Sequence, residues 1–279
     1  MKVFITVAPV GHYGLTDVKN PKTPMEVAQA VIECASEGAS LAHLHIRDAD
    51  GNLARDTYVF DETVKLIRRE SDIIIQGSSG GVPKGGVGEL TREERCVAVK
   101  NSEVEVGSIN MGSVNFGPDP FINTGDDIRF WADEMKKHNV KPELEIFEGG
   151  MLSAVRDLID EGYLKPPYLC AFCPGYSLAA IPNSLFFLKS MLPENALWGL
   201  NHQNMKDFSL SAVALGMGAS YMRIGFEDGI YYAPGKIAKS NAELTAKAAS
   251  LIRAMGFEVA TPDEIRKILG INKIRSIQQ

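Results

Sequence analysis

The sequence is poor in the features that mark secreted, membrane-spanning and nucleic-acid-binding proteins. It has only four cysteines in 279 residues, too few for the disulfide framework of a small secreted domain. No apolar run is long enough to cross a bilayer, and the N-terminus lacks the charged head and long apolar core of a signal peptide. The formal net charge is -6, without a run of lysine or arginine, which argues against nucleic acid and membrane partners. We therefore expect a cytoplasmic protein that acts on small molecules.

One cysteine pair, Cys170 and Cys173, has the C-x-x-C spacing of zinc and redox motifs. The pair lies in an apolar run, where residues three apart face opposite sides of a strand, and no second pair exists. We interpret these cysteines as buried, reduced thiols.

Apolar, strand-like runs alternate with amphipathic, helix-like segments along the chain. The predicted strands span 3–8, 41–46, 72–77, 103–109, 142–147, 168–173, 196–201 and 219–224. The predicted helices span 24–38, 57–70, 91–100, 126–138, 150–161, 182–191, 206–217 and 240–255. This alternation favours an α/β fold, a TIM (β/α)8 barrel, over a doubly wound open sheet. We predict a single catalytic domain over residues 1–279, with an extra C-terminal helix at 262–269.

A histidine pair at the end of the second predicted strand is the first candidate for a site. Side chains alternate along a strand, so His43 and His45 should aim at one point. A catalytic divalent metal uses such ligands with a third, often a carboxylate, and keeps one position open. Glu227, after the last strand, is the favoured third ligand, and His12 and His202 are competitors.

Other polar residues follow the predicted strands, where the catalytic groups of a barrel lie. Asp228 is a candidate base, because the neighbouring Arg223 would keep it ionised. Glu145, on the fifth strand, is the next candidate. The glycine-rich run 80–88 fits either a phosphate-binding loop or a lid, and Lys84 would meet a phosphate in either case.

At this point the sequence resembles the β-keto acid cleavage enzymes, first named for 3-keto-5-aminohexanoate cleavage. The segments that carry the likeness are Thr6 to Pro9, Ala39 to Asp48 with His-Leu-His-Ile-Arg-Asp, Ser78 to Gly81, Gly112 to Gly117, Pro142 to Phe147, Arg223 to Asp228, Ser240 to Glu243 and Ala260 to Glu264. Their order and spacing together are specific.

The resemblance implies a zinc-dependent TIM barrel, usually a homotetramer, that exchanges acyl groups between a β-keto acid and acetyl-CoA. The products would be acetoacetate and a new acyl-CoA. The residues that the resemblance assigns to one bound Zn²⁺ per chain are His43, His45 and Glu227, and it makes Asp228 the base, oriented by Arg223. Ser78, Ser79 and Asn110 are candidates to hold the substrate carboxylate or an oxyanion, with Ser79 taken as catalytic and Glu145 as substrate-binding.

The loop after the first strand departs from the commoner Thr-Gly-Ala pattern of the family and reads Val10-Gly11-His12. It offers His12 to a substrate tail and no carboxylate to an ammonium group, whose unpaired burial is costly. We therefore predict that His12 contacts a neutral or anionic tail. A cationic tail is expected only if Tyr13, Tyr231 and Tyr232 form an aromatic cage.

Two alternatives to this reading remain open. A metal-dependent hydrolase of the amidohydrolase type also carries His-x-His in a barrel, but it normally places the pair after the first strand and adds further histidines. A non-catalytic small-molecule-binding barrel is the other alternative, and it would leave Glu227, Asp228 and Arg223 together without a purpose.

Overall fold

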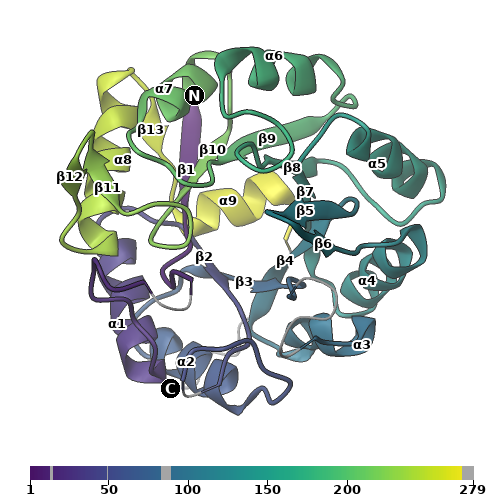
Figure 1. Ribbon diagram of the computed structural model, residues 1–279, viewed down its shortest axis with the longest axis horizontal. Coiled ribbons are helices and arrows are strands. Elements are labelled where there is room, and N and C mark those ends of the chain that lie inside the picture. Colours follow the sequence, from purple (N-terminus) through teal and green to yellow (C-terminus); the bar gives the residue numbers. More distant parts are fainter. Residues whose placement is uncertain (13–14, 49, 83–88, 272–279) are drawn as a thin grey trace.

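The computed structural model describes residues 1–12, 15–48, 50–82 and 89–271, and within them eight parallel strands close into a barrel (Figure 1). The barrel strands are β1 (Lys2–Val7), β2 (Leu41–Leu44), β3 (Ile74–Ser78), β4 (Val104–Asn110), β7 (Lys141–Ile146), β8 (Tyr168–Phe172), β9 (Ala196–Asn201) and β10 (Tyr221–Ile224). Closure comes from β1, which pairs in parallel with both β2 and β10. The predicted TIM barrel is therefore confirmed, and the open-sheet alternative is wrong.

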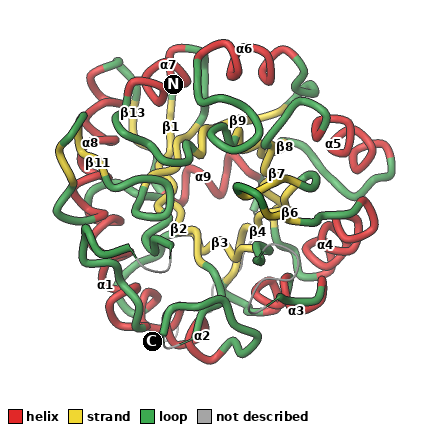
Figure 2. Tube along the Cα trace, in the orientation of Figure 1, coloured by secondary structure: helices red, strands yellow, loops and turns green. Residues whose placement is uncertain are grey.

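Helices surround the strands as an outer ring (Figure 2). They are α1 (Pro24–Ser36), α2 (Tyr58–Arg68), the short α3 (Arg92–Arg95) followed by a 3₁₀ turn (Val97–Lys100), α4 (Gly125–Lys137), α5 (Met151–Asp160), α6 (Pro182–Ser190), α7 (Ser209–Gly216) and α8 (Asn241–Ala254). This order places a helical segment after each barrel strand, as expected for a (β/α)8 barrel.

Local sequence explains where several helices begin. The side chain of Thr23 accepts a hydrogen bond from the backbone of Glu26, and the Glu26 carboxylate accepts one from the backbone of Thr23. The same capping box starts α3, α4 and α9 (Pro262–Leu269). The strands instead read as continuous apolar runs because helices cover the outer face of the sheet and side chains fill the barrel.

The amino end of the barrel is covered by the C-terminal part of the described chain. The short strand β13 (Glu258–Val259) pairs with the first residues of β1, and α9 follows it across the centre of the ring (Figure 1). Ile265 and Leu269 of α9 are buried, and Arg266 bonds to Glu105 at the start of β4. The extra helix predicted at 262–269 is present.

Several features of the fold differ from the sequence prediction. The helix predicted at 91–100 is divided into α3 and a 3₁₀ turn, and β13 was not predicted. The antiparallel hairpins β5 (Val114–Phe116) with β6 (Asp119–Phe121), and β11 (Tyr231–Ala233) with β12 (Lys236–Ile237), were not predicted. The second barrel strand ends at Leu44, two residues early. The residues after Leu44 do not continue the pairing with β3. In the loop that follows, Arg47 forms an isolated antiparallel bridge with Leu53.

None of the helices in the described part of the chain combines the length and the apolar character needed to cross a membrane.

Candidate metal and acid-base site

The two histidines and Glu227 meet at the carboxyl end of the barrel. His43 is the last residue but one of β2 and His45 follows the strand, and their Nε2 atoms lie 3.2 Å apart. The Glu227 carboxylate approaches both rings, with Oε1 3.6 Å from His43 Nε2 and Oε2 3.5 Å from His45 Nε2. Among the described residues, this trio is the group of three whose ligand atoms all lie within 4.8 Å of one another. Two imidazoles and one carboxylate with an open side fit a catalytic divalent metal.

A hydrogen-bonded chain behind His43 fixes its orientation. Gln76 of β3 directs its amide nitrogen to Glu143 Oε2 at 2.8 Å, which leaves its amide oxygen 2.6 Å from His43 Nδ1. His43 must therefore carry its proton on Nδ1, and the lone pair on Nε2 faces the trio. Burial lowers the pKa of His43 to about 3. The ring is thus neutral near pH 7, the form that binds a metal.

A buried guanidinium joins the candidate base to this trio. Arg223 of β10 donates from Nε to Asp228 Oδ2 at 2.8 Å and from Nη2 to Asp228 Oδ1 at 2.7 Å. The same Nη2 lies 3.4 Å from Glu227 Oε1, and Nη1 donates to Glu145 Oε1 at 3.3 Å. One guanidinium therefore holds three carboxylates around the opening of the barrel.

The turn after β10 is possible because of a glycine. Gly225 has a φ of +130°, and a Cβ at this position would lie 2.2 Å from the backbone oxygen of Ala8. Only glycine tolerates this conformation and this close approach. The turn folds Glu227 and Asp228 back over the end of the barrel, where Arg223 meets them.

The surroundings give the carboxyl groups of the site different affinities for a proton. Burial raises the pKa of Asp228, although Arg223 opposes the shift, and burial raises the pKa of Glu145 to about 8. Desolvation also acts on Glu227, but His45, His43 and Arg223 hold the pKa of Glu227 well below its usual range. Glu227 is thus suited to remain a charged ligand, while Asp228 is a stronger base than a free aspartate.

These groups line a cavity of about 150 Å³. Its described lining consists of His43, His45, Ser78, Gly80, Gly81, Asn110, Phe116, Phe121, Glu145, Phe147, Cys173, Tyr176, Asn201, Gln203, Arg223, Glu227 and Asp228. Eight of the ten residues predicted from the sequence are therefore brought together here. Their roles are not tested by their placement and stay predictions.

The other two predicted residues lie elsewhere. Ser79 is buried outside the described lining and donates its hydroxyl to the backbone oxygen of Ser108 at 2.6 Å, so the geometry favours Ser78 as the serine that meets a ligand. His12 is exposed and is also outside this lining. The glycine-rich run is described only as far as Val82, so Lys84 and the choice between lid and phosphate loop lie outside the described residues.

Sequence reasoning did not assign a role to several residues of the cavity. Phe116, Phe121, Phe147 and Tyr176 pack together on one side, and we refer to them as the aromatic wall. Gln76 was also missed. A glutamine inside a strand does not show from the sequence that its side chain will contact the ring of His43. Asn201 is the last residue of the strand predicted at 196–201. A polar residue at the carboxyl end of a barrel strand is the signal that could have marked it as a site residue.

The cysteines behave as predicted from their apolar context. All four are buried and free, and burial raises the pKa of Cys170 to about 12. Burial thus disfavours the thiolate form that redox and zinc chemistry would need at the C-x-x-C pair.

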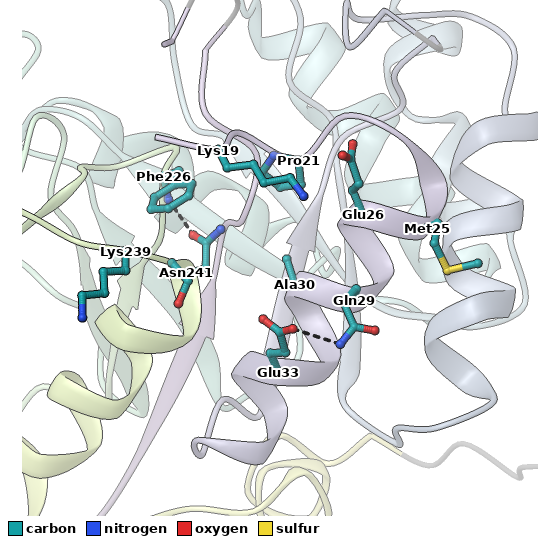
Figure 3. A pocket seen from close by; sticks show the side chains of 11 residues that line it. Lys19, Pro21, Met25, Glu26, Gln29, Ala30, Glu33, Phe226, Lys239 and Asn241 are labelled. Carbon is teal, nitrogen blue, oxygen red and sulfur yellow. Dashed lines mark hydrogen bonds between the residues drawn. The ribbon is translucent and has the colours of Figure 1, made fainter. Parts of the chain in front are cut away.

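A second cavity, of about 300 Å³, lies between α1 and the start of α8 (Figure 3). Its polar side chains are largely used locally, since Gln29 bonds to Glu33 and Asn241 bonds to the backbone of Phe226. It is larger than the cavity at the barrel opening, but the histidine pair and the Arg223 cluster are not among its described lining. We place the chemistry at the smaller cavity.

Comparison with known proteins gives a consistent result. A family model described as beta-keto acid cleavage enzyme matches residues 2–271. The 3-keto-5-aminohexanoate cleavage enzyme of Fusobacterium nucleatum is 34% identical over 277 residues, which cover 98% of this chain and 99% of that enzyme. The 3,5-dioxohexanoate:acetyl-CoA acetone transferase of Paraburkholderia graminis is 29% identical over an alignment of 301 residues. This alignment covers 96% of this chain and 95% of that enzyme.

Among solved structures, the apo structure of ObcA matches with a TM-score of 0.79 and 18% identity, covering 91% of this chain and 66% of that chain. At this identity the likeness supports the barrel fold alone.

Proposed function

Because the chain belongs to the β-keto acid cleavage enzyme family, we propose that it catalyses an acyl exchange between a β-keto acid and acetyl-CoA, giving acetoacetate and a new acyl-CoA. The observation that carries the proposal is the position of Arg223. Its Nη2 contacts both the candidate base Asp228, at 2.7 Å, and the candidate ligand Glu227, at 3.4 Å. Proton transfer and metal binding are thus arranged around one fixed group.

The chain's own residues would move a proton twice. Asp228 takes a proton from the carbon between the carboxylate and the ketone, and Arg223 holds the carboxylate in place. The resulting carbanion attacks the thioester carbonyl of acetyl-CoA, a carbon-carbon bond forms, and the CoA thiolate leaves. The thiolate then adds to the original ketone carbon, whose bond to the former carbanion carbon breaks. The electron pair returns to that carbon, which recovers the proton from Asp228 and becomes part of acetoacetate.

His43, His45 and Glu227 would hold the divalent metal, which would supply a Lewis acid for the negative charge that develops on the ketone oxygen. The neutral His43 ring and the charged Glu227 support this assignment, and Zn²⁺ is the metal that we propose on the basis of ligand type. Ser78 and Asn110 line the cavity and are proposed to bind the substrate carboxylate.

Further parts of the proposal rest on composition and on the family. We propose that residues 1–279 act as one catalytic domain in a homotetramer, in the cytoplasm, without a nucleic acid or membrane partner. The net charge of -6 supports the last point.

The experiment that tests the proposed function follows the thioester. Purified protein, loaded with Zn²⁺, is incubated with a panel of β-keto acids with and without acetyl-CoA, and new acyl-CoA is measured by mass spectrometry. We expect acetoacetate and the new acyl-CoA in equal amounts and only when acetyl-CoA is present. Consumption of substrate without the thioester would instead indicate the amidohydrolase-like alternative, and binding without turnover would indicate the non-catalytic barrel.

A further inference from the structure

Asn201 is a buried amide in the cavity that the proposed chemistry does not use. It is the last residue of β9, is 2% exposed, and lines the cavity at the barrel opening. Neither its amide nitrogen nor its amide oxygen has a hydrogen-bond partner among the described residues. Burying an amide with both groups unpaired is unfavourable. A ligand that supplies both bonds would remove this cost.

The depth of Asn201 indicates which ligand it would meet. Its register partner on the neighbouring strand is Arg223, the residue that holds the candidate base. A side chain at this level of the barrel lies beside the small substrate, whereas the bulk of acetyl-CoA must remain toward the open end of a cavity of about 150 Å³. Strands β10 and β1 separate Asn201 from the candidate ligand His43 on β2, whereas the candidate ligand Glu227 follows the neighbouring β10. Asn201 is therefore placed to meet a part of the substrate that extends from the reacting carbons away from His43.

The aromatic wall offers an apolar surface to the carbon chain of a tail. The ring centroids of Phe116 and Tyr176 are 4.8 Å apart, and those of Phe147 and Tyr176 are 5.4 Å apart. These rings therefore pack against one another on one side of the cavity.

The acidic groups of the described lining are also engaged. Asp228 makes a two-bond pair with Arg223, Glu227 faces the histidines, and Glu145 contacts Arg223. An ammonium tail would therefore have to share a carboxylate with Arg223 or with the histidines. A carboxylate tail would meet the arginine of this lining only beside the three acids that already surround it.

From these contacts we propose that Asn201 selects a β-keto acid whose tail is uncharged and carries a hydroxyl or carbonyl oxygen. The amide nitrogen donates to that oxygen, and the amide oxygen accepts from it when the oxygen is a hydroxyl. The aromatic wall packs against the carbon chain. This assignment rests on the proposed function for its reaction and adds the class of substrate.

The test compares tails of nearly equal size on the Zn²⁺-loaded protein. The panel consists of 5-hydroxy-3-oxohexanoate, 3,5-dioxohexanoate, 3-oxohexanoate, 5-amino-3-oxohexanoate and 3-oxoadipate, each with acetyl-CoA. We expect kcat/KM for the hydroxyl or diketo substrate to exceed that for the alkyl, ammonium and carboxylate substrates by about tenfold or more. A preference for any of the last three overturns the proposal.

Two variants assign the preference to the side chain. Asn201→Leu keeps a similar volume without hydrogen bonds and should reduce the ratio of kcat/KM between 5-hydroxy-3-oxohexanoate and 3-oxohexanoate by about tenfold. Asn201→Asp should shift the preference toward 5-amino-3-oxohexanoate. Gln29→Leu makes a related amide-to-leucine change on the exposed face of α1 and should leave the ratio as it is in the unaltered protein. An unchanged ratio in Asn201→Leu overturns the proposal.

Calorimetric binding of the same five acids, without acetyl-CoA, separates this inference from the proposed function. If no acid yields an acyl-CoA, the proposed function is wrong. The affinities of the five acids then decide by themselves whether Asn201 selects the tail. Tighter binding of the uncharged oxygenated tails, lost in Asn201→Leu, supports it. Equal binding of all five acids, or tighter binding of a charged tail, overturns it.

Discussion

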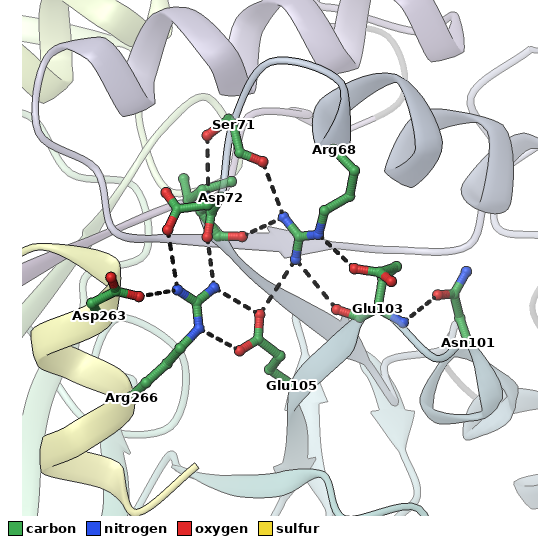
Figure 4. Close-up of polar contacts among 9 residues, drawn as sticks. Arg68, Ser71, Asp72, Asn101, Glu103, Glu105, Asp263 and Arg266 are labelled. Atoms are coloured by element: carbon green, nitrogen blue, oxygen red, sulfur yellow. Dashed lines mark hydrogen bonds and ion pairs between the residues drawn. The ribbon is translucent and has the colours of Figure 1, made fainter. Parts of the chain in front are cut away.

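Two clusters of arginine and carboxyl groups lie at opposite ends of the barrel, and they differ in how many arginines each buried acid meets. The amino-end cluster comprises Arg68, Asp72, Glu103, Glu105, Asp263 and Arg266 (Figure 4). The carboxyl-end cluster comprises Glu145, Arg223, Glu227 and Asp228. In the first, both oxygens of the buried Glu105 receive bonds from two arginines. In the second, three carboxyl groups surround one guanidinium.

The comparison separates a structural cluster from a functional one. A buried charge whose partners are complete stabilises one arrangement and has nothing left to bind. Three carboxyl groups that share one guanidinium beside two histidines can still accept a cation, and a divalent metal would supply it. Arginine-carboxylate pairing by itself therefore does not identify a site, whereas an incomplete set of partners does.

Asp228→Asn should give the largest effect, because it removes the base without changing its shape. We expect the rate of acyl-CoA formation to fall by about 10²–10⁴-fold, with bound metal and the urea midpoint nearly unchanged. Turnover and metal content measured on the same preparation check this. Retention of normal turnover would place the base elsewhere, with Glu145 the next candidate.

Arg266→Met should lower stability and leave turnover unchanged, the reverse of the result expected for Asp228→Asn. It removes one of the two arginines that pair with the buried Glu105, the other being Arg68, and we expect a loss of about 3 kcal/mol in the free energy of unfolding. At a temperature where the variant stays folded, kcat should be unchanged. Arg129→Met, which breaks the exposed pair with Glu161, is the control and should change stability little. Equal effects of the two variants would contradict the structural role of the amino-end cluster.

Gln76→Leu sharpens the comparison at the metal. The amide that accepts from His43 Nδ1 is lost, so the ring is free to rotate or to change tautomer. We expect the affinity for Zn²⁺ to fall by about 10–100-fold, measured by competition with a chelator on folded protein. An affinity equal to that of the unaltered protein would show that Gln76 does not orient the ligand.

Glu145→Gln tests the carboxyl-end cluster through the dependence of stability on pH alone. Burial raises the pKa of Glu145 to about 8 from an ordinary value of 4.5. Between these values the folded state retains a proton that the unfolded state releases, so stability is fully present below the unfolded pKa and is lost as pH rises toward 8. The slope approaches about 1.4 kcal/mol per pH unit for one proton. The variant should lack this component in urea titrations of metal-free protein from pH 5 to 8, and parallel curves would exclude it.

The sequence was sufficient to predict which strands carry the candidate metal and base residues. These residues lie at or after the carboxyl ends of apolar runs, and the carboxyl ends of parallel strands must meet in a barrel. They are His43, His45, Arg223, Glu227 and Asp228. That proximity is found in the structure, although the roles remain to be tested.

Residues whose importance depends on a partner distant in sequence were not predictable in the same way. Gln76 matters because its amide contacts His43. Asn201 matters because no described residue forms a hydrogen bond with its buried amide. The hairpin β5–β6 was missed because its strands are three residues each, too short to give a period. Its Phe116 and Phe121 acquire a role only when Phe147 and Tyr176 pack beside them.

The bond between Glu105 and Arg266 also has a consequence for synthesis of the protein. The two residues are 161 positions apart, so a ribosome releases Glu105 long before the helix that carries its partner. Until α9 arrives, the nascent barrel has an open floor with a carboxylate in it, and Arg68 is the nearby cation of the same cluster that has already emerged. Docking of α9 therefore closes the floor and brings the second guanidinium to Glu105 in one step, after all eight barrel strands have been synthesised.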